Sequence, residues 1–181
     1  MIAVAGSGAF GTALAISLAQ NSDVLLWARN PETAAQMQAS RENAQRLPGA
    51  RLPKSITVTA DFGSIPAEIP VLLAVPMQQL RSTVAALGKN LESRPLVACC
   101  KGVELFTGLG PTAILSEVAG STPAILTGPS FAADIAQGLP TALTLACGDE
   151  PTLRRLQTVL TTPTSASTAP PIPPARNSAA L

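Results

Sequence analysis

The sequence predicts an α/β fold with a doubly wound, mainly parallel sheet. Short apolar segments of strand type alternate along residues 2–160 with segments of helix type. The first strand–helix pair is joined by the turn Gly6-Ser7-Gly8-Ala9-Phe10-Gly11, which has the spacing Gly-x-Gly-x-x-Gly. Strands that alternate with helices through short connections lie parallel in one sheet, with helices on both faces. Together these observations predict a Rossmann-like domain.

The glycine turn indicates where a dinucleotide would bind. Gly6 permits a tight turn, Gly8 lets the backbone approach a pyrophosphate, and Gly11 lets the helix pack closely. The helix that follows offers free N–H groups and its positive dipole end to an anion. Small-residue turns occur in many α/β proteins, so the strand before and the helix after the turn are what make it specific.

The second strand, expected over residues 23–28, ends in Arg29. In dinucleotide-binding folds an Asp or Glu near this place holds the ribose 2′-hydroxyl, whereas an arginine suits a 2′-phosphate. Arg29 therefore favours NADP, with NAD remaining open. The alternative is that Arg29 is an ordinary solvated side chain.

The remaining elements follow from capping residues and apolar patterns. Asn30-Pro31-Glu32 predicts the start of a polar helix that ends near Arg46. A rigid loop is expected over residues 47–53 because it holds two prolines and a glycine. We expect further strands at 56–59, 70–75, 95–100, 124–127 and 141–147, and further helices at 77–87, 109–118, 131–137 and 150–160.

Ligands of open parallel sheets bind beyond the carboxyl ends of the strands. Five places should therefore line one cleft: the glycine turn, Arg29, Val75-Pro76, Lys101 and Gly128-Pro129-Ser130. Lys101 could meet a substrate phosphate or polarise a carbonyl there, although it could also be an ordinary exposed lysine. Ser130 could hold substrate or merely cap the next helix.

Composition narrows the function. The formal net charge is +1 without a basic block, so nucleic acid is not an expected partner. No apolar run reaches the length of a membrane span. The three cysteines form neither a metal spacing nor an even disulfide set, so we expect no metal and a cytoplasmic protein. Histidine and tyrosine are absent, which excludes a dehydrogenase that relies on either side chain as its proton donor.

Six motifs in order carry a resemblance: G-S-G-A-F-G-T-A-L-A, V-L-L-W-A-R-N-P-E, R-L-P-G-A-R-L-P, V-P-M-Q-Q-L-R, C-K-G-V-E and T-G-P-S-F-A-A-D-I-A-Q-G-L-P-T-A. Over about residues 1–160 the chain resembles the N-terminal domain of bacterial NAD(P)-dependent glycerol-3-phosphate dehydrogenases. The resemblance implies reduction of dihydroxyacetone phosphate to sn-glycerol 3-phosphate for phospholipid synthesis, with NADP or NAD as cofactor. It also implies a possible homodimer in the complete enzyme.

The resemblance also assigns residues. Ala9 and Phe10 match positions that touch the cofactor pyrophosphate, and Arg29 matches one at the adenosine end. Phe10 replaces the more usual Trp or Tyr, so an aromatic ring is kept without its polar group. Lys101 matches a lysine shared by cofactor and substrate. Gly128 and Ser130 match substrate positions, and Ala132 matches a further cofactor contact.

The expected organisation is a dinucleotide-binding domain at residues 1–160 and a disordered tail at residues 161–181, which is rich in Pro, Ser, Thr and Ala. The family's second, all-helical domain, with its proton-donor lysine, is expected to be absent. A frameshift near Leu160 would explain the change of composition.

The catalytic residue is unknown, because the family's proton-donor lysine lies in the second domain, which is expected to be absent. The chain is either the cofactor-binding half of this enzyme or a dinucleotide-binding fragment without activity. Other two-domain hydroxy-acid reductases are a weaker third option.

Overall fold

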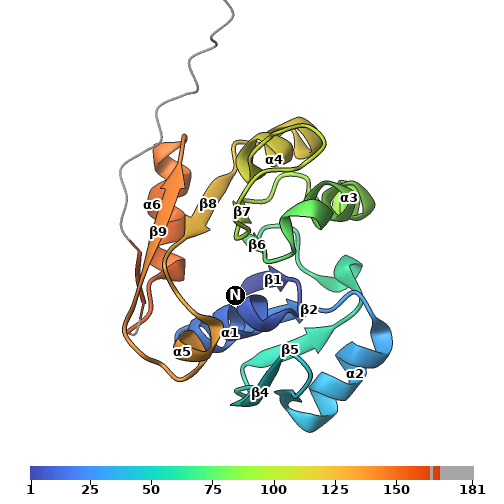
Figure 1. Ribbon diagram of the computed structural model, residues 1–181, viewed down its shortest axis with the longest axis vertical. Helices are drawn as coiled ribbons and strands as arrows, with labels where there is room; N and C mark the ends of the chain where they lie inside the picture. The colour runs from blue at the N-terminus through green and yellow to red at the C-terminus, as the bar shows by residue number, and fades with distance from the viewer. Residues whose placement is uncertain (164, 168–181) are drawn as a thin grey trace, which may run out of the picture.

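The computed structural model describes residues 1–163 and 165–167 and is built around an eight-stranded sheet (Figure 1). The strands lie in the order β10-β9-β8-β7-β6-β1-β2-β5, and every neighbouring pair is parallel except β8 and β9. Their bounds are β1 Ile2–Ala5, β2 Val24–Trp27, β5 Ile56–Thr59, β6 Val71–Leu73, β7 Leu96–Ala98, β8 Ala124–Thr127, β9 Thr141–Cys147 and β10 Ser165–Ser167. The sequence-based prediction of a doubly wound, mainly parallel sheet is confirmed.

Helices cover both faces of this sheet (Figure 1). They are α1 Ala9–Leu18, α2 Pro31–Ser40, α3 Met77–Leu87, α4 Pro111–Ala119, α5 Ala132–Ala136 and α6 Glu150–Leu160. Residues of α1, α2, α5 and α6 share one apolar cluster with the sheet, and residues of α3 and α4 share the other. Short 3₁₀ turns at Phe62–Ser64 and Gly88–Leu91 add to the second cluster.

Strand β1 shows why the sequence folds this way. Ile2 and Val4 belong to the cluster under α1, whereas Ala3 and Ala5 belong to the cluster under α3. All four side chains are fully buried. Successive side chains of a strand point to opposite faces, so a central parallel strand covered on both faces must be apolar throughout.

Several predicted boundaries agree with the structure. The helix over residues 77–87 ends where expected, at a glycine with positive φ, Gly88. Strands β5, β8 and β9 and helix α6 also have the predicted bounds. Helix α1 directly follows the glycine turn and ends at Leu18.

The segment after α2 differs from the prediction. The helix ends at Ser40 rather than near Arg46, because Arg41 adopts the left-handed conformation. The expected loop at residues 47–53 contains β4 (Leu47–Arg51), which pairs antiparallel with β3 (Glu42–Asn43). Tertiary contacts stabilise this hairpin. Leu47 and Leu52 are buried, and the Arg41 guanidinium donates hydrogen bonds to the carbonyls of Pro53 and Ile56.

The predicted tail also differs in part. Ser165–Ser167 forms β10, which pairs in parallel with the start of β9. The Oγ1 atom of Thr162 and the Oγ atom of Ser17 lie 3.3 Å apart, so the segment that leads to β10 packs on α1. The rest of the tail, residues 164 and 168–181, lies outside the described residues. Within the described part of the chain, no helix is long and apolar enough to cross a membrane.

Candidate functional site

The glycine turn between β1 and α1 is closely packed at two of its three glycines. Gly6 has a φ of +126°, and a Cβ there would lie 2.4 Å from the Ala74 carbonyl oxygen. A Cβ on Gly11 would lie 2.0 Å from the Gly6 carbonyl oxygen. At Gly8 no atom lies within 4 Å of the Cβ position. Gly6 and Gly11 are therefore required by packing, as predicted, whereas Gly8 leaves open space above the turn.

The open space at Gly8 lies at the N-terminus of α1. Gly8 is the N-cap residue, and among the described residues no side chain caps this helix and no acid occupies its first turn. The first N–H groups of a helix need a partner, and the helix dipole favours an anion. The turn therefore fits the pyrophosphate of a dinucleotide on two grounds: room for the group and donors directed at it.

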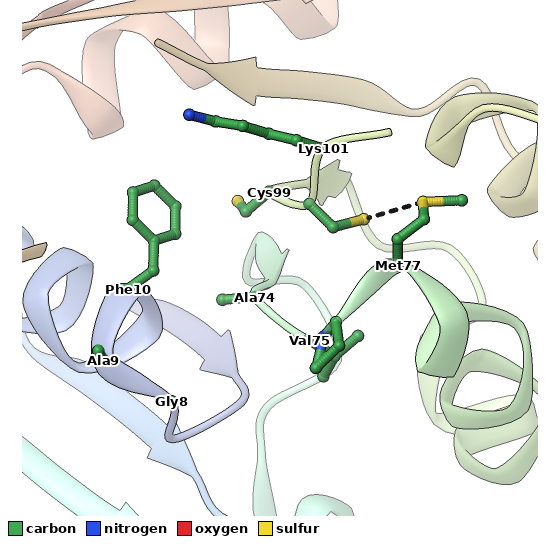
Figure 2. Close-up of a pocket in the computed structure, with 10 residues that line it drawn as sticks. Gly8, Ala9, Phe10, Ala74, Val75, Met77, Cys99 and Lys101 are labelled. Atoms are coloured by element: carbon green, nitrogen blue, oxygen red, sulfur yellow. Dashed lines mark hydrogen bonds between the residues drawn. The ribbon is translucent and has the colours of Figure 1, made fainter. Parts of the chain in front are cut away.

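A cavity of about 470 Å³ opens beside this turn (Figure 2). It is lined by Gly8, Ala9, Phe10, Ala74, Val75, Pro76, Met77, Cys99, Cys100 and Lys101. Figure 2 shows Phe10 and Lys101 projecting into it from α1 and from the segment after β7. The two cysteines are buried, and burial raises the pKa of both thiols. Lys101 is thus the single charged side chain among the residues that line this cavity.

Lys101 is held toward the neighbouring strand. Its Nζ donates a hydrogen bond of 2.7 Å to the carbonyl oxygen of Gly128, which follows β8. Gly128 has its own packing requirement, since a Cβ there would lie 2.6 Å from the Ala142 carbonyl oxygen in β9. An ammonium group has three protons to donate, so this bond leaves two for a ligand. The geometry suits a substrate phosphate or carbonyl at the mouth of the cavity.

The loop after Lys101 is anchored by Glu104, the last residue of the motif C-K-G-V-E, to which the sequence analysis assigned no role. The Glu104 carboxylate accepts a hydrogen bond of 2.9 Å from Arg81 Nε in α3, and Arg81 also pairs with Glu117 in α4. Gln78 binds the same loop through the Val103 carbonyl and the Leu105 N–H. The hydrogen bond from Arg81 holds the pKa of Glu104 below its usual range. This anchoring limits where the backbone at Lys101 can move.

A second cavity of about 590 Å³ adjoins the first and extends past the end of β2. Both cavities are lined by Gly8, Ala9, Ala74, Val75 and Pro76. The second is also lined by Arg29, by Trp27 and by two residues from the hairpin turn, Gln45 and Arg46. The hairpin residues were not predicted for the site, because the polar pattern placed residue 46 at the end of a helix.

Asn43 connects the hairpin to the glycine turn. Its side chain is 3% exposed, and its Nδ2 donates hydrogen bonds of 2.8 Å to the Ser7 carbonyl and to Thr12 Oγ1. In the sequence Asn43 is one polar residue within a polar stretch, and that signal is too weak to single it out. The contact fixes the hairpin relative to the glycine turn.

The structure thus brings together most of the predicted site. Gly6, Gly8, Ala9, Phe10, Arg29 and Lys101 line the two adjoining cavities, and Gly128 joins them through Lys101. Gly11, Ser130 and Ala132 are not among the described residues that line these two cavities. Ser130 precedes Phe131, the N-cap of α5, so it does not cap that helix, and Ala132 begins α5 and packs against the core. The ligand contacts assigned to all these residues stay predictions. In the described ranges no cluster of His, Cys, Asp and Glu could hold a metal ion.

Comparison with known proteins agrees with this geometry. Residues 1–153 match the family described as NAD-dependent glycerol-3-phosphate dehydrogenase N-terminus. The chain is 54% identical over 162 residues to glycerol-3-phosphate dehydrogenase [NAD(P)+] of Ruegeria sp. (strain TM1040), covering 89% of this chain and 51% of that protein. It is 51% identical over 157 residues to the enzyme of the same name from Roseobacter denitrificans, and this match covers 86% of this chain and 49% of that protein.

Solved structures show the same fold. Glycerol-3-phosphate dehydrogenase from Coxiella burnetii superposes with a TM-score of 0.82 at 25% identity, over 92% of this chain and 52% of that one. The enzyme from Plasmodium falciparum gives a TM-score of 0.83 at 22% identity, and the match covers 92% of this chain and 51% of that one. The chain spans about half the length of the curated relatives it matches. A doubly wound strand order, a glycine turn that fits a dinucleotide and a family match over residues 1–153 together show that the chain belongs to the NAD-dependent glycerol-3-phosphate dehydrogenase family, as its N-terminal, dinucleotide-binding domain.

Proposed function

We propose that this chain supplies the cofactor-binding half of an enzyme that reduces dihydroxyacetone phosphate to sn-glycerol 3-phosphate with NADPH or NADH. One observation carries the proposal: a single cavity joins the open Gly8 turn at the α1 N-terminus to the Lys101 ammonium group. The turn suits the cofactor pyrophosphate, and a cation in the same cavity suits a phosphorylated ketone.

The bound dinucleotide would supply a hydride for the ketone carbon. The chain's own residues would position the reactants. The α1 N-terminus would hold the pyrophosphate, and Phe10 would cover part of the apolar wall with Val75 and Met77. Lys101 would use its two remaining protons to bind the substrate phosphate or to polarise the carbonyl oxygen as negative charge develops there.

A second candidate function is dinucleotide binding without turnover. It is favoured by the cavity lining, where Lys101 is the one charged group and both thiols have raised pKa values. For either function we infer a cytoplasmic protein, since all three cysteines are free and buried.

The test uses the 181-residue chain. Binding of NADPH is followed by energy transfer from Trp27, the single tryptophan, which lines the second cavity. Oxidation of NADPH is then measured with and without dihydroxyacetone phosphate. The variant Lys101→Met is compared with Lys89→Met, whose lysine is exposed and lines a separate cavity between α3 and α4.

For the enzyme, we expect substrate-dependent oxidation that Lys101→Met lowers by at least about tenfold, the loss expected when one charge-assisted contact is removed. Lys89→Met should behave like the unaltered chain. Binding of NADPH without oxidation would favour the second candidate. A folded chain that binds no dinucleotide would refute both.

A further inference from the structure

Lys101 is followed by a glycine in an unusual backbone conformation. Gly102 is exposed and has a φ of +94°, and no atom lies within 4 Å of the position that a Cβ would occupy. Residues with a Cβ rarely adopt this φ, so the glycine lets the chain bend directly after Lys101. Nothing packs against the bend to hold it in place. The contacts that hold the backbone on this side of Lys101 therefore lie further along the chain.

Helix α3 supplies those contacts through two side chains. Gln78 Nε2 donates a hydrogen bond of 2.9 Å to the Val103 carbonyl, and Gln78 Oε1 accepts one of 3.0 Å from the Leu105 N–H. Arg81 Nε donates to both oxygens of the Glu104 carboxylate, at 2.9 and 3.1 Å. Gln78 and Arg81 are three residues apart, so they lie on the same face of the helix. One face of α3 thus holds three consecutive residues of the loop.

The loop of residues 103–109 is also tied together internally. The Glu104 N–H donates a hydrogen bond of 2.9 Å to the Leu109 carbonyl, and the Gly108 N–H donates one of 2.7 Å to the Glu104 carbonyl. The Glu104 carboxylate accepts a further hydrogen bond from Thr107 Oγ1. Its side chain is 11% exposed, and a hydrogen bond between two ionised groups is stronger than one between neutral groups. The position of the loop therefore follows the position of α3.

The same helix begins at the first cavity. Met77, the first residue of α3, lines this cavity together with Lys101. Figure 2 shows the Lys101 side chain extended over the cavity, away from Met77 and toward the side of Phe10. Its Nζ atom binds the Gly128 carbonyl. Lys101 is thus held at its ammonium group by the residue after β8, and at its backbone by α3 through the loop.

We infer that Gln78 and Arg81 are positioning residues for the substrate, which act through the loop of residues 103–109 to hold Lys101 where its ammonium group meets a phosphorylated ketone. The inference rests on the proposed function and concerns substrate affinity. Neither Gln78 nor Arg81 lines either cavity, so both act at a distance from the ligands. The lysine stem is flexible, and a backbone free to move at Lys101 would have to be ordered when substrate binds, which costs affinity.

The experiment measures dissociation constants for the full chain by calorimetry. NADP⁺ is titrated first, and dihydroxyacetone phosphate is then titrated with NADP⁺ saturating, so that no hydride can be transferred. The variants are Gln78→Ala, Arg81→Leu and the conservative change Arg81→Lys. Gln36→Ala is the matched control, because Gln36 is an exposed glutamine of α2 that lines neither cavity. Each variant is also made in the Lys101→Met background, and circular dichroism confirms that it is folded.

We expect Gln78→Ala and Arg81→Leu to weaken the binding of dihydroxyacetone phosphate by about fivefold or more and that of NADP⁺ by less than about twofold. Arg81→Lys should recover part of the loss, because lysine keeps a charge-assisted hydrogen bond to Glu104. In the Lys101→Met background the same changes should weaken substrate binding by less than about twofold, because residues that act through one another are not additive. Gln36→Ala should change neither affinity.

Three results would overturn the inference and leave the proposed function standing: an equal loss of both ligands, no loss of substrate affinity, or a loss that is undiminished in the Lys101→Met background. If Arg81→Leu does not fold, Gln78→Ala decides the outcome, because it removes no charge. Binding of NADP⁺ without dihydroxyacetone phosphate would overturn both the inference and the role proposed for Lys101. A folded chain that binds no dinucleotide would overturn the proposed function itself, so the failures are distinguishable.

Discussion

Replacing Gly8 and Gly11 separately by alanine should have different effects: Gly8→Ala should weaken dinucleotide binding, and Gly11→Ala should destabilise the fold. Both glycines belong to the same turn, and each change adds one methyl group. At Gly11 the new Cβ would lie 2.0 Å from the Gly6 carbonyl oxygen, which is backbone and cannot rotate away. At Gly8 the new Cβ would meet no atom within 4 Å.

The magnitudes follow from these distances. The Gly11→Ala methyl must retreat by about 1 Å to reach the shortest separation that real Cβ atoms show, which moves α1 away from the turn. Overpacking of this kind costs about 1–3 kcal/mol, a large share of the roughly 5–15 kcal/mol typical of a domain. For a chain of this size the melting temperature should fall by roughly 2–4 °C per kcal/mol.

Gly8→Ala should leave stability nearly unchanged. Gly8 has a φ of −70° and a ψ of 176°, which alanine adopts without strain. Alanine is a poorer N-cap residue than glycine, but it also lowers the entropy of the unfolded chain, and the two effects oppose each other within about 1 kcal/mol. The methyl group instead fills the space proposed for the pyrophosphate, so NADPH affinity should fall by about tenfold or more.

The assay combines thermal unfolding, followed by circular dichroism and Trp27 fluorescence, with NADPH titration at a temperature where both variants are folded. Trp27 is a suitable reporter because it is buried and its Nε1 donates to the Ala60 carbonyl. Equal destabilisation of the chain by Gly8→Ala and by Gly11→Ala would refute the reasoning. Unchanged NADPH binding by Gly8→Ala would refute it as well.

Two further predictions concern the supports of the site. Asn43→Ala should lower the free energy of unfolding by about 1–3 kcal/mol in urea denaturation, because it removes two hydrogen bonds and leaves the buried Thr12 hydroxyl without one of its partners. Gln45→Ala, an exposed position on the same turn, is the control, and an equal loss there would contradict the prediction. Arg81 lowers the pKa of Glu104, so the stabilisation from the ionised carboxylate is present above pH about 4.3 and is lost as the pH falls through the lower folded-state pKa. The urea midpoint of Glu104→Gln should therefore vary less than that of the unaltered chain from about pH 5 to about pH 3, and parallel profiles would argue against this role.

The glycine turn and the strand–helix alternation could be predicted because their signals are local. A buried central strand needs an unbroken apolar run, as in Ile2–Ala5, and a helix end is marked by a glycine such as Gly88. The same locality explains why Lys101 could be placed at the ligand edge, since it follows a strand. These features depend on residues close together in the chain.

The β3–β4 hairpin could not be predicted, because its stability comes from distant residues. Asn43 binds the turn at Ser7 and Thr12, and Arg41 binds the carbonyls of Pro53 and Ile56. The antiparallel direction of β9 and its pairing with β10 likewise depend on which strand is adjacent in space.

The sequence by itself determined the fold class, the glycine turn between β1 and α1 and the lysine that follows β7. Only the tertiary structure placed Arg46 and Arg29 on one cavity and anchored the Lys101 loop through Glu104 and Arg81. The physical reason is that backbone conformation and burial follow short-range patterns. The charge and shape of a cavity, in contrast, are set by side chains that only the packed chain brings together.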